Sequence, residues 1–131
     1  MKVALVLLAL SLAVVGAAMV AGEQPAPLYA RDIEPIFLKE CGDCHGADNP
    51  KKGLDLSAGK GLEHLLGVTS QSEPEYVLVK SGDPAASYLW MKLNHTNKQG
   101  KGMPRGLFTA KKLPQEQLDL VGRWITAGAQ P

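Results

Sequence analysis

The sequence predicts an all-α domain of short helices that follows an export segment. Three stretches, residues 29–39, 84–93 and 113–128, carry apolar residues at intervals of three and four, which is the spacing of a helix with one buried face. Only one short run, residues 76–79, is rich in β-forming residues. The 131 residues fit one domain in addition to the export segment.

The first 22 residues have the pattern of a secretory signal peptide. A lysine at position 2 is followed by an almost wholly apolar run that ends in small residues. Cleavage is expected after Ala18, Ala21 or Gly22, and the last two are favoured because the sequence then turns polar. The run is also just long enough to be an uncleaved membrane anchor. We predict a signal peptide over residues 1–22 and an exported domain over residues 23–131.

Residues 29–39 are predicted to form the first helix of the domain. Asp32 is expected to cap its start, and Pro35 is tolerated in a first turn because the amides there have no intrahelical partner. Apolar residues recur at helical spacing up to Phe37. The motif that begins at Cys41 should therefore lie at the end of a short amphipathic helix.

The motif is Cys41-Gly42-Asp43-Cys44-His45, the C-x-x-C-H pattern of covalent haem attachment. Two thiols three positions apart can each form a thioether with one vinyl group of a haem, and His45 can then bind the iron. Cys41 and Cys44 are the only cysteines in the chain. The motif predicts one haem c, held by two thioethers.

Three other interpretations of the motif are weaker but remain open. A structural zinc site needs four ligands, and the other histidines, His64 and His95, lack metal-ligand spacing to it. A redox-active thiol pair needs a βαβ context, which the surrounding pattern does not indicate. A disulfide would give His45 no role.

The composition is consistent with a bound haem and argues against nucleic acid as a partner. Lys and Arg number 14 against 13 Asp and Glu, whereas nucleic-acid binding favours a strongly basic domain. Aromatic residues make up only 5% of the chain, so the core is thin. A buried porphyrin would add apolar volume, although aliphatic residues could also fill a small core.

The segments after the motif are predicted to be a loop and two helices. Leu54 and Leu56 follow a loop rich in Gly, Asn and Pro, and one or both should lie against the haem. Residues 62–66 could form a short helix, with His64 at the surface. The turn before the next helix places Asp83 at the cap of residues 84–93.

Met103 is the predicted second ligand of the iron. It lies in a polar, glycine-containing loop, where packing gives no reason for a methionine. A thioether can bind haem iron opposite a histidine, and Pro104 would stiffen the backbone that presents the sulfur. His95 is the next candidate, and a loop methionine that only covers an apolar patch is the structural alternative. Met91, among leucines at helical spacing, is expected in the core.

The last predicted helix spans residues 113–128. Pro114 suits the first helical position, and Gly128 ends the helix. The helix is expected to pack against the helix before Cys41, and Gly122 could allow a close approach there.

With these features the chain resembles a class I cytochrome c, especially the small single-haem domains of planctomycete and myxobacterial secreted proteins. The resemblance covers nearly all of the exported part. It rests on residues 33–37, 41–46, 53–56, 81–84, 87–90, 103–104 and 124–129. Those relatives often have a proline before the Gly-Asp-Pro turn, where this chain has Ser81.

The resemblance implies four to five short helices around one covalently bound haem. Cys41 and Cys44 would carry the thioethers, His45 would be the proximal ligand and Met103 the distal ligand. The implied function is single-electron transfer between redox partner proteins, outside the cytoplasm of a bacterium, with no catalysis. The membrane would be involved only if the N-terminal segment is not cleaved.

A second function from another class is a haem enzyme subunit or a gas or redox sensor, in which Met103 leaves the iron. The residues around Met103 include Lys98, Lys101 and Arg105 but no acid for peroxidase chemistry. These basic residues, with Lys51 and Lys52, could surround the haem edge and attract an acidic partner, or they could be ordinary solvated residues.

Overall fold

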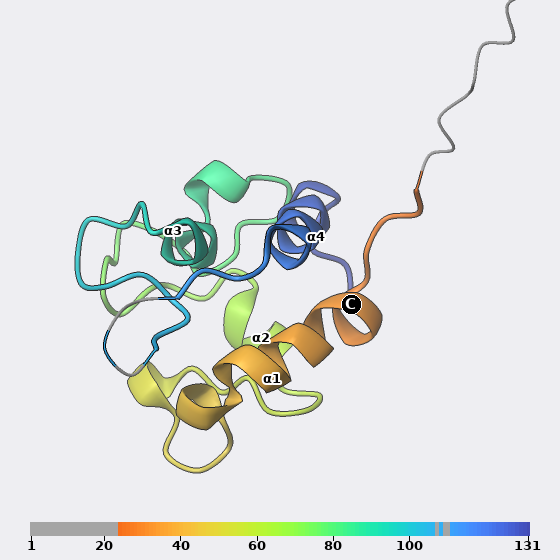
Figure 1. Ribbon diagram of the computed structural model, residues 1–131. Coiled ribbons are helices and arrows are strands. Elements are labelled where there is room, and N and C mark those ends of the chain that lie inside the picture. Colours follow the sequence, from red (N-terminus) through yellow and green to blue (C-terminus); the bar gives the residue numbers. More distant parts are fainter. Residues whose placement is uncertain (1–23, 107, 109–110) are drawn as a thin grey trace, which may run out of the picture.

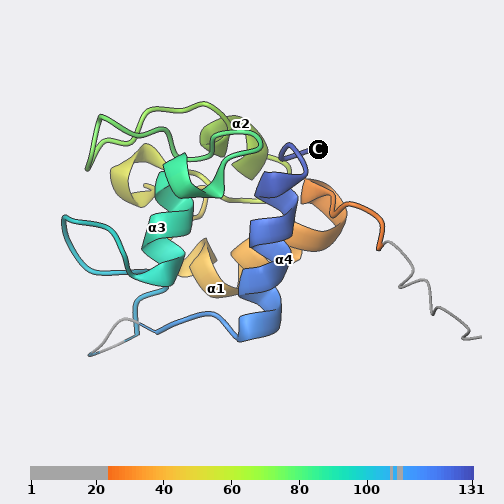
Figure 2. The ribbon, with the colours of Figure 1, turned by 90° about the horizontal axis from the view of Figure 1, so that it is seen from above.

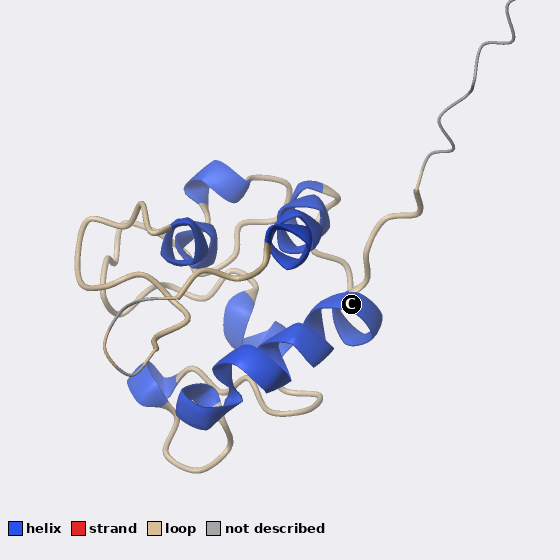
Figure 3. Cartoon of the chain, viewed as in Figure 1, coloured by secondary structure: helices blue, strands red, loops and turns tan. Residues whose placement is uncertain are grey.

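The computed structural model describes residues 24–106, 108 and 111–131, and the predicted signal peptide, residues 1–22, lies outside this part. The described part is helical and has no β-strand (Figure 3), which confirms the predicted all-α class. Its α-helices are α1 (Glu34–His45), α2 (Gly61–Leu65), α3 (Tyr88–Asn94) and α4 (Gln115–Thr126). Its shorter helical turns are η1 (Tyr29–Ile33), η2 (Lys51–Gly53) and η3 (Pro84–Ala86). None of the described helices is both long and apolar enough to span a bilayer.

The four α-helices surround one small core. In Figure 1, α1 runs along the lower side, α3 and α4 lie on the upper side and α2 lies between them, and Figure 2 shows the same arrangement from above. Each helix contributes a fully buried side chain: Phe37, Leu65, Leu93 and Trp124. The apolar stripes of short helices are thus buried against one another, since helices of this length gain most of their stability from packing.

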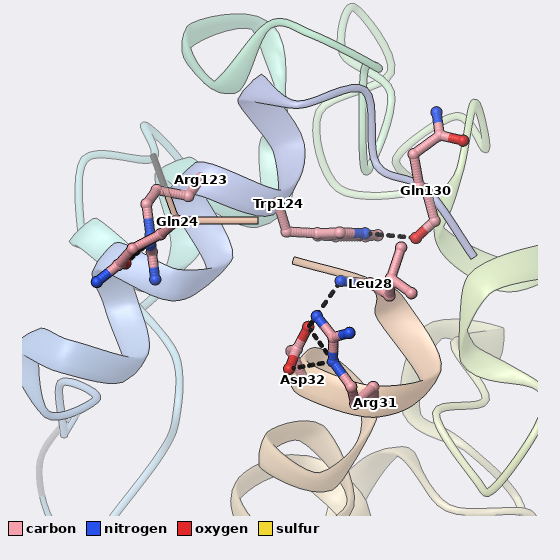
Figure 4. Close-up of polar contacts among 7 residues, drawn as sticks. All are labelled: Gln24, Leu28, Arg31, Asp32, Arg123, Trp124 and Gln130. Atoms are coloured by element: carbon pink, nitrogen blue, oxygen red, sulfur yellow. Dashed lines mark hydrogen bonds and ion pairs between the residues drawn. The ribbon is translucent and has the colours of Figure 1, made fainter. Parts of the chain in front are cut away.

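The first predicted helix exists, but it begins differently. Residues 29–33 form a single π-helical segment, η1, and α1 then continues to His45. Asp32 does not cap α1: its Oδ2 accepts a hydrogen bond from the Leu28 amide at 2.8 Å and pairs with Arg31 at 2.7 Å (Figure 4). The expected cap is therefore wrong. Asp32 lies within η1, the turn before α1, and its side chain bonds the backbone at the start of that turn instead. Pro35 lies in the first turn of α1, as predicted.

The C-terminal segment closes onto η1 (Figure 4). The Trp124 indole Nε1 donates to the Gln130 carbonyl at 2.9 Å, and the same carbonyl accepts from the Tyr29 amide at 2.9 Å. The Trp124 and Tyr29 ring centroids are 5.5 Å apart. This confirms that the last helix packs against the first helical segment, although Gly122 has another partner: its close neighbour is Trp90 on α3.

The predicted helix over residues 84–93 is broken at Ser87. Asp83 caps the segment as expected, since its Oδ1 accepts from the Ala86 amide at 3.1 Å. The helical turn η3 nevertheless ends at Ala86, and α3 begins at Tyr88. Ser87 is fully buried and extended; its hydroxyl donates to the Asp83 carbonyl at 2.8 Å and accepts from the Lys80 amide at 2.9 Å. Serine side chains that bond nearby backbone compete with helix formation in this way.

The remaining elements agree with the predictions to within two residues. The helix expected over 62–66 spans Gly61–Leu65, and the last helix begins at Gln115, so Pro114 occupies the cap rather than the first helical position. Gly128 follows the end of α4 with a φ of 102°. The β-forming run 76–79 makes only isolated bridges, such as Leu66 with Val79.

Candidate functional site

The last turns of α1 present the two cysteines and His45. Cys41 and Cys44 are three positions apart, so they lie on one face of the helix. The helix ends at His45. At the next residue, Gly46, a Cβ would lie 2.7 Å from the Gly42 carbonyl oxygen. Glycine is therefore required at Gly46 for the chain to leave the helix directly after the histidine.

His45 is oriented by the segment that follows the loop. Its Nδ1 lies 3.2 Å from the Leu54 carbonyl oxygen, and its own carbonyl accepts from the Leu56 amide at 2.7 Å. Burial lowers the pKa of His45 and so favours the neutral ring. A neutral imidazole whose Nδ1–H bonds a carbonyl has Nε2 left for a metal, the usual arrangement of a metal-binding histidine.

The two cysteines are free and differ in environment. Burial, with smaller contributions from the charges of Glu40 and Cys44, raises the pKa of Cys41 to about 12. Cys44 has a cation beside it, since Lys51 Nζ lies 3.5 Å from its Sγ. The disulfide alternative is not formed, and in the described part no three or more His, Cys, Asp or Glu residues are grouped to hold a metal ion, which gives the zinc alternative no support.

A pocket of about 890 Å³ lies against this end of α1, and all four predicted site residues, Cys41, Cys44, His45 and Met103, line it. The volume is within the usual range for small-molecule and cofactor sites, about 300–1,000 Å³. Much of its wall is aliphatic and comes from α2, α3 and the segments around them: Leu54, Leu56, Leu65, Val68, Leu78, Leu89 and Leu93. Both leucines that were expected against the haem, Leu54 and Leu56, are among them.

Met103 reaches the pocket from the segment after α3. Its amide donates to the Lys92 carbonyl at 2.9 Å, and the side chain is half-buried. Met91 does not line the pocket and is half-buried outside the core cluster, so its expected core position is wrong.

His95, the second candidate for the distal ligand, does not line the pocket. Its ring packs so closely on Gly102 that an added Cβ there would overlap it. Its Nε2 lies 3.2 Å from the Met103 carbonyl oxygen. The geometry gives His95 a role in holding the backbone at Met103 rather than in binding a metal.

His64 keeps part of its predicted surface position but is also part of the pocket wall. It lines the pocket while 37% of its side chain stays exposed. A single histidine on a five-residue helix gave no sequence signal for this, because the pocket forms only when α2 packs beside the end of α1.

Sequence reasoning also missed a polar group in the pocket wall, Tyr88. Its hydroxyl is buried and has no hydrogen-bond partner. Burial, followed by the negative charge of Glu73, raises the pKa of Tyr88. An apolar cavity that has an unpartnered donor in its wall, two thiols, an imidazole and a thioether fits an apolar macrocycle with polar substituents, such as haem. In the sequence Tyr88 looked only like an apolar member of a helix.

Residues 41–105 match the family model described as planctomycete cytochrome C. The match supports a cytochrome c-like domain. It begins at Cys41 and ends just after Met103, so it contains all four predicted site residues of this cytochrome c-like domain. No curated protein and no solved structure gave a significant match.

The family match implies haem c binding and suggests an electron carrier rather than an enzyme. A second, open groove of about 1,020 Å³ lies on another side of the cytochrome c-like domain, between α3 and α4. Trp90, Gly122 and Arg123 are among its lining residues, and none of the four predicted site residues is. The chemistry therefore belongs to the smaller pocket at the end of α1.

Proposed function

We propose that this protein is an exported single-haem c-type cytochrome that carries single electrons. Cys41 and Cys44 would form the thioethers, and His45 and Met103 would be the axial ligands. The observation that carries the proposal is that these four side chains line one pocket, although Met103 is 58 residues beyond His45 in the chain.

Haem c, when bound, supplies reversible one-electron exchange between Fe(II) and Fe(III). The residues of the chain would hold the haem and set its reduction potential. The Leu54 carbonyl fixes the ring of His45 through Nδ1. Met103 opposite a histidine raises the reduction potential. If His45 and Met103 both bind the iron, no coordination site would remain for a substrate, which would favour electron transfer over catalysis.

We further propose that the natural partners are redox proteins with an acidic docking surface. Basic residues outnumber acidic ones in the pocket lining, with Lys51, Lys52, Lys92 and Arg105 against Glu40 and Asp43. Lys98 and Lys101 are exposed beside the segment that carries Met103. Such a local excess of positive charge speeds the encounter with a partner of opposite charge.

The alternative function, a haem enzyme or sensor with a labile distal ligand, uses the same pocket. Glu73 contacts the Gln99 backbone, in the segment before Met103, and is not among the pocket-lining residues. It is therefore not positioned as a general acid for peroxidase chemistry.

The test is the visible and near-infrared spectrum of the protein exported from a host that matures c-type cytochromes. We expect c-type bands in the reduced protein that carbon monoxide leaves unchanged, and a weak near-infrared sulfur-to-iron band in the oxidised protein. Met103→Ala should abolish this band and admit carbon monoxide. Met91→Ala is the matched control and should preserve both properties, because Met91 lies outside the pocket.

Two results would contradict the proposal. Rapid carbon monoxide binding by the unmodified protein would mean an open iron, and would favour the enzyme or sensor alternative. A colourless exported protein would exclude covalent haem at Cys41 and Cys44.

A further inference from the structure

The segment of residues 95–103, called here the ligand loop, carries Met103 but has no regular secondary structure. Such a segment can hold a side chain in place only if its backbone polar groups have fixed partners. Some contacts are internal, since Asn97 Nδ2 donates to the Gln99 and Gly100 carbonyls at 2.6 and 3.0 Å. Others come from outside the loop: the Thr96 amide donates to the Met91 carbonyl at 2.9 Å, and the side chains of Lys92 and Glu73 bind the loop further on.

Lys92, on α3, contacts the ligand loop through both its ammonium and its carbonyl, and the carbonyl also accepts from the His95 amide at 3.3 Å. Its Nζ donates to the Gln99 carbonyl at 3.0 Å and to the Lys101 carbonyl at 3.1 Å, and its own carbonyl accepts from the Met103 amide at 2.9 Å. The ammonium also lies 5.2 Å from the centroid of the Tyr88 ring, within cation–π range. One residue thus joins both halves of the loop to a helix of the core.

Glu73 binds the same residue, Gln99, at its amide. It is only 1% exposed, and its Oε1 accepts from the Gln99 amide at 2.8 Å. The Glu73 backbone is itself held, because its amide donates to Ser70 Oγ at 3.1 Å. Gln99 therefore donates through its amide to Glu73 and accepts through its carbonyl from Lys92, two residues from different parts of the chain.

Burying a carboxyl group costs free energy unless its oxygens are hydrogen-bonded. The second oxygen of Glu73, Oε2, has no hydrogen-bond partner. An apolar residue would fill the same space without that cost. Both contacts of Gln99 are instead made by side-chain end groups, the Lys92 ammonium and a Glu73 carboxyl oxygen. Their shared target is the loop that ends at Met103.

We propose that Lys92 and Glu73 are positioning residues that clamp the ligand loop at Gln99 and so keep the Met103 sulfur on the iron. This inference rests on the proposed His45 and Met103 ligation. A thioether is a soft ligand with low affinity for a hard, oxidised metal ion, so its retention depends on how firmly the backbone presents it. Without the clamp the loop would open locally while the helices stay folded.

The experiment uses the haem-containing protein and two pairs of variants. Lys92→Met removes the ammonium but keeps the stem, and Lys92→Arg restores a donor. Glu73→Leu removes the acceptor for the Gln99 amide, and Glu73→Gln restores one. Lys60→Met is the charge-matched control, because Lys60 pairs with Glu63 on the surface and does not line the pocket.

Three readouts separate a clamp from general stabilisation. They are the rate of carbon monoxide binding to the reduced protein, the temperature at which the sulfur-to-iron band is lost, and the temperature at which far-ultraviolet circular dichroism reports loss of the helices. Hydrogen exchange at the Gln99 and Met103 amides reports opening of the loop independently of the iron.

We expect Lys92→Met and Glu73→Leu to bind carbon monoxide about tenfold faster than the unmodified protein, as the loss of one or two net hydrogen bonds predicts. The sulfur-to-iron band should be lost at a lower temperature, whereas the temperature at which the helices unfold should not change. The Gln99 and Met103 amides should exchange faster. The Arg, Gln and Lys60→Met variants should remain close to the unmodified protein.

Unchanged carbon monoxide rates and amide exchange in Lys92→Met and Glu73→Leu would overturn the clamp. An equal decrease in the temperatures of band loss and of helix unfolding would also overturn the clamp, because it would show that the two residues only stabilise the fold. Failure of the proposed ligation looks different, since the unmodified protein would then lack the sulfur-to-iron band before any substitution is made.

Discussion

At the scale of single residues, Tyr29 packs against Gly61 and leaves no room there for a side chain. The Tyr29 ring is buried, its hydroxyl has no hydrogen-bond partner, and it lies where a Cβ of residue 61 would be. Gly61 opens α2, which forms part of the pocket wall. A missing side chain therefore sets how closely α2 approaches η1.

Gly61→Ala should lower the free energy of unfolding by about 1–3 kcal/mol, because Tyr29 is enclosed and cannot move away. Tyr29→Phe in the same chain should recover part of that loss by removing the hydroxyl. Gly42→Ala, in the middle of α1 with open space around it, is the control and should stabilise by about 0.5–1 kcal/mol. Chemical denaturation measures all three, and equal effects at Gly61 and Gly42 would contradict the packing argument.

Tyr29 also makes stability depend on alkaline pH. Burial, followed by the negative charge of Glu34, raises the pKa of Tyr29 well above its ordinary value. Above about pH 10 the unfolded chain releases this proton while the folded chain keeps it, so the free energy of unfolding falls by up to about 1.4 kcal/mol per pH unit. Tyr29→Phe should remove this part of the slope in denaturation experiments at several alkaline pH values, whereas below pH 10 the stabilities of the two proteins should change with pH in the same way.

At the scale of elements, the helices differ in how far local sequence determines them. The apolar residues of α4 repeat regularly, and Leu118, Val121, Trp124 and Ile125 are all buried as that pattern predicts. The helix expected over residues 84–93 is instead split at Ser87. The bond from Ser87 to the Asp83 carbonyl is local, but the bond with Lys80 forms where Val77 bridges to Ser87 and brings residues 77–80 beside it.

The packing of α4 on η1 can be tested at its largest side chain. Trp124→Phe should lower the free energy of unfolding by about 1–3 kcal/mol, since it removes buried ring volume and leaves one fewer donor for the Gln130 carbonyl. Trp90→Phe is the matched control, because Trp90 is only half-buried beside the open groove. A smaller loss at Trp124 than at Trp90, measured by denaturant titration, would contradict the assignment of Trp124 to the core.

At the scale of the whole molecule, the pocket brings together residues from both halves of the described chain. The net charge of the sequence is only +1, yet the pocket lining has more basic than acidic residues. The asymmetry is therefore local, and its effect should depend on salt, because exposed charges are screened beyond about 8 Å at physiological ionic strength.

Lys98→Glu combined with Lys101→Glu should slow electron transfer with an acidic redox partner about tenfold or more at low salt, and the difference should shrink at high salt. The control is Lys39→Glu with Lys60→Glu, which changes the charge equally at two exposed lysines that lie outside both the pocket lining and the ligand loop. Stopped-flow kinetics over a range of ionic strength measures the effect. Equal rates for both double variants at low salt would mean that the lysines are ordinary solvated residues.

The sequence by itself determined the features that depend on neighbours in the chain. The order of Cys41, Cys44 and His45 is a local chemical pattern, and the repeats of α4 follow from helix geometry alone. The loop after α3 and the Asp83 cap are equally local. For these features the prediction and the structure agree, because no distant residue is needed to specify them.

Only the tertiary structure decided which residues share the pocket and what each polar group contacts. It placed His64 in the pocket wall, turned His95 toward the Met103 backbone, and joined Glu73 to Gln99 across 26 residues of chain. Sequence periodicity could not reveal these contacts, because it reports which face of an element is buried but not which element covers it. That choice depends on the packing of short helices that have little stability until they meet.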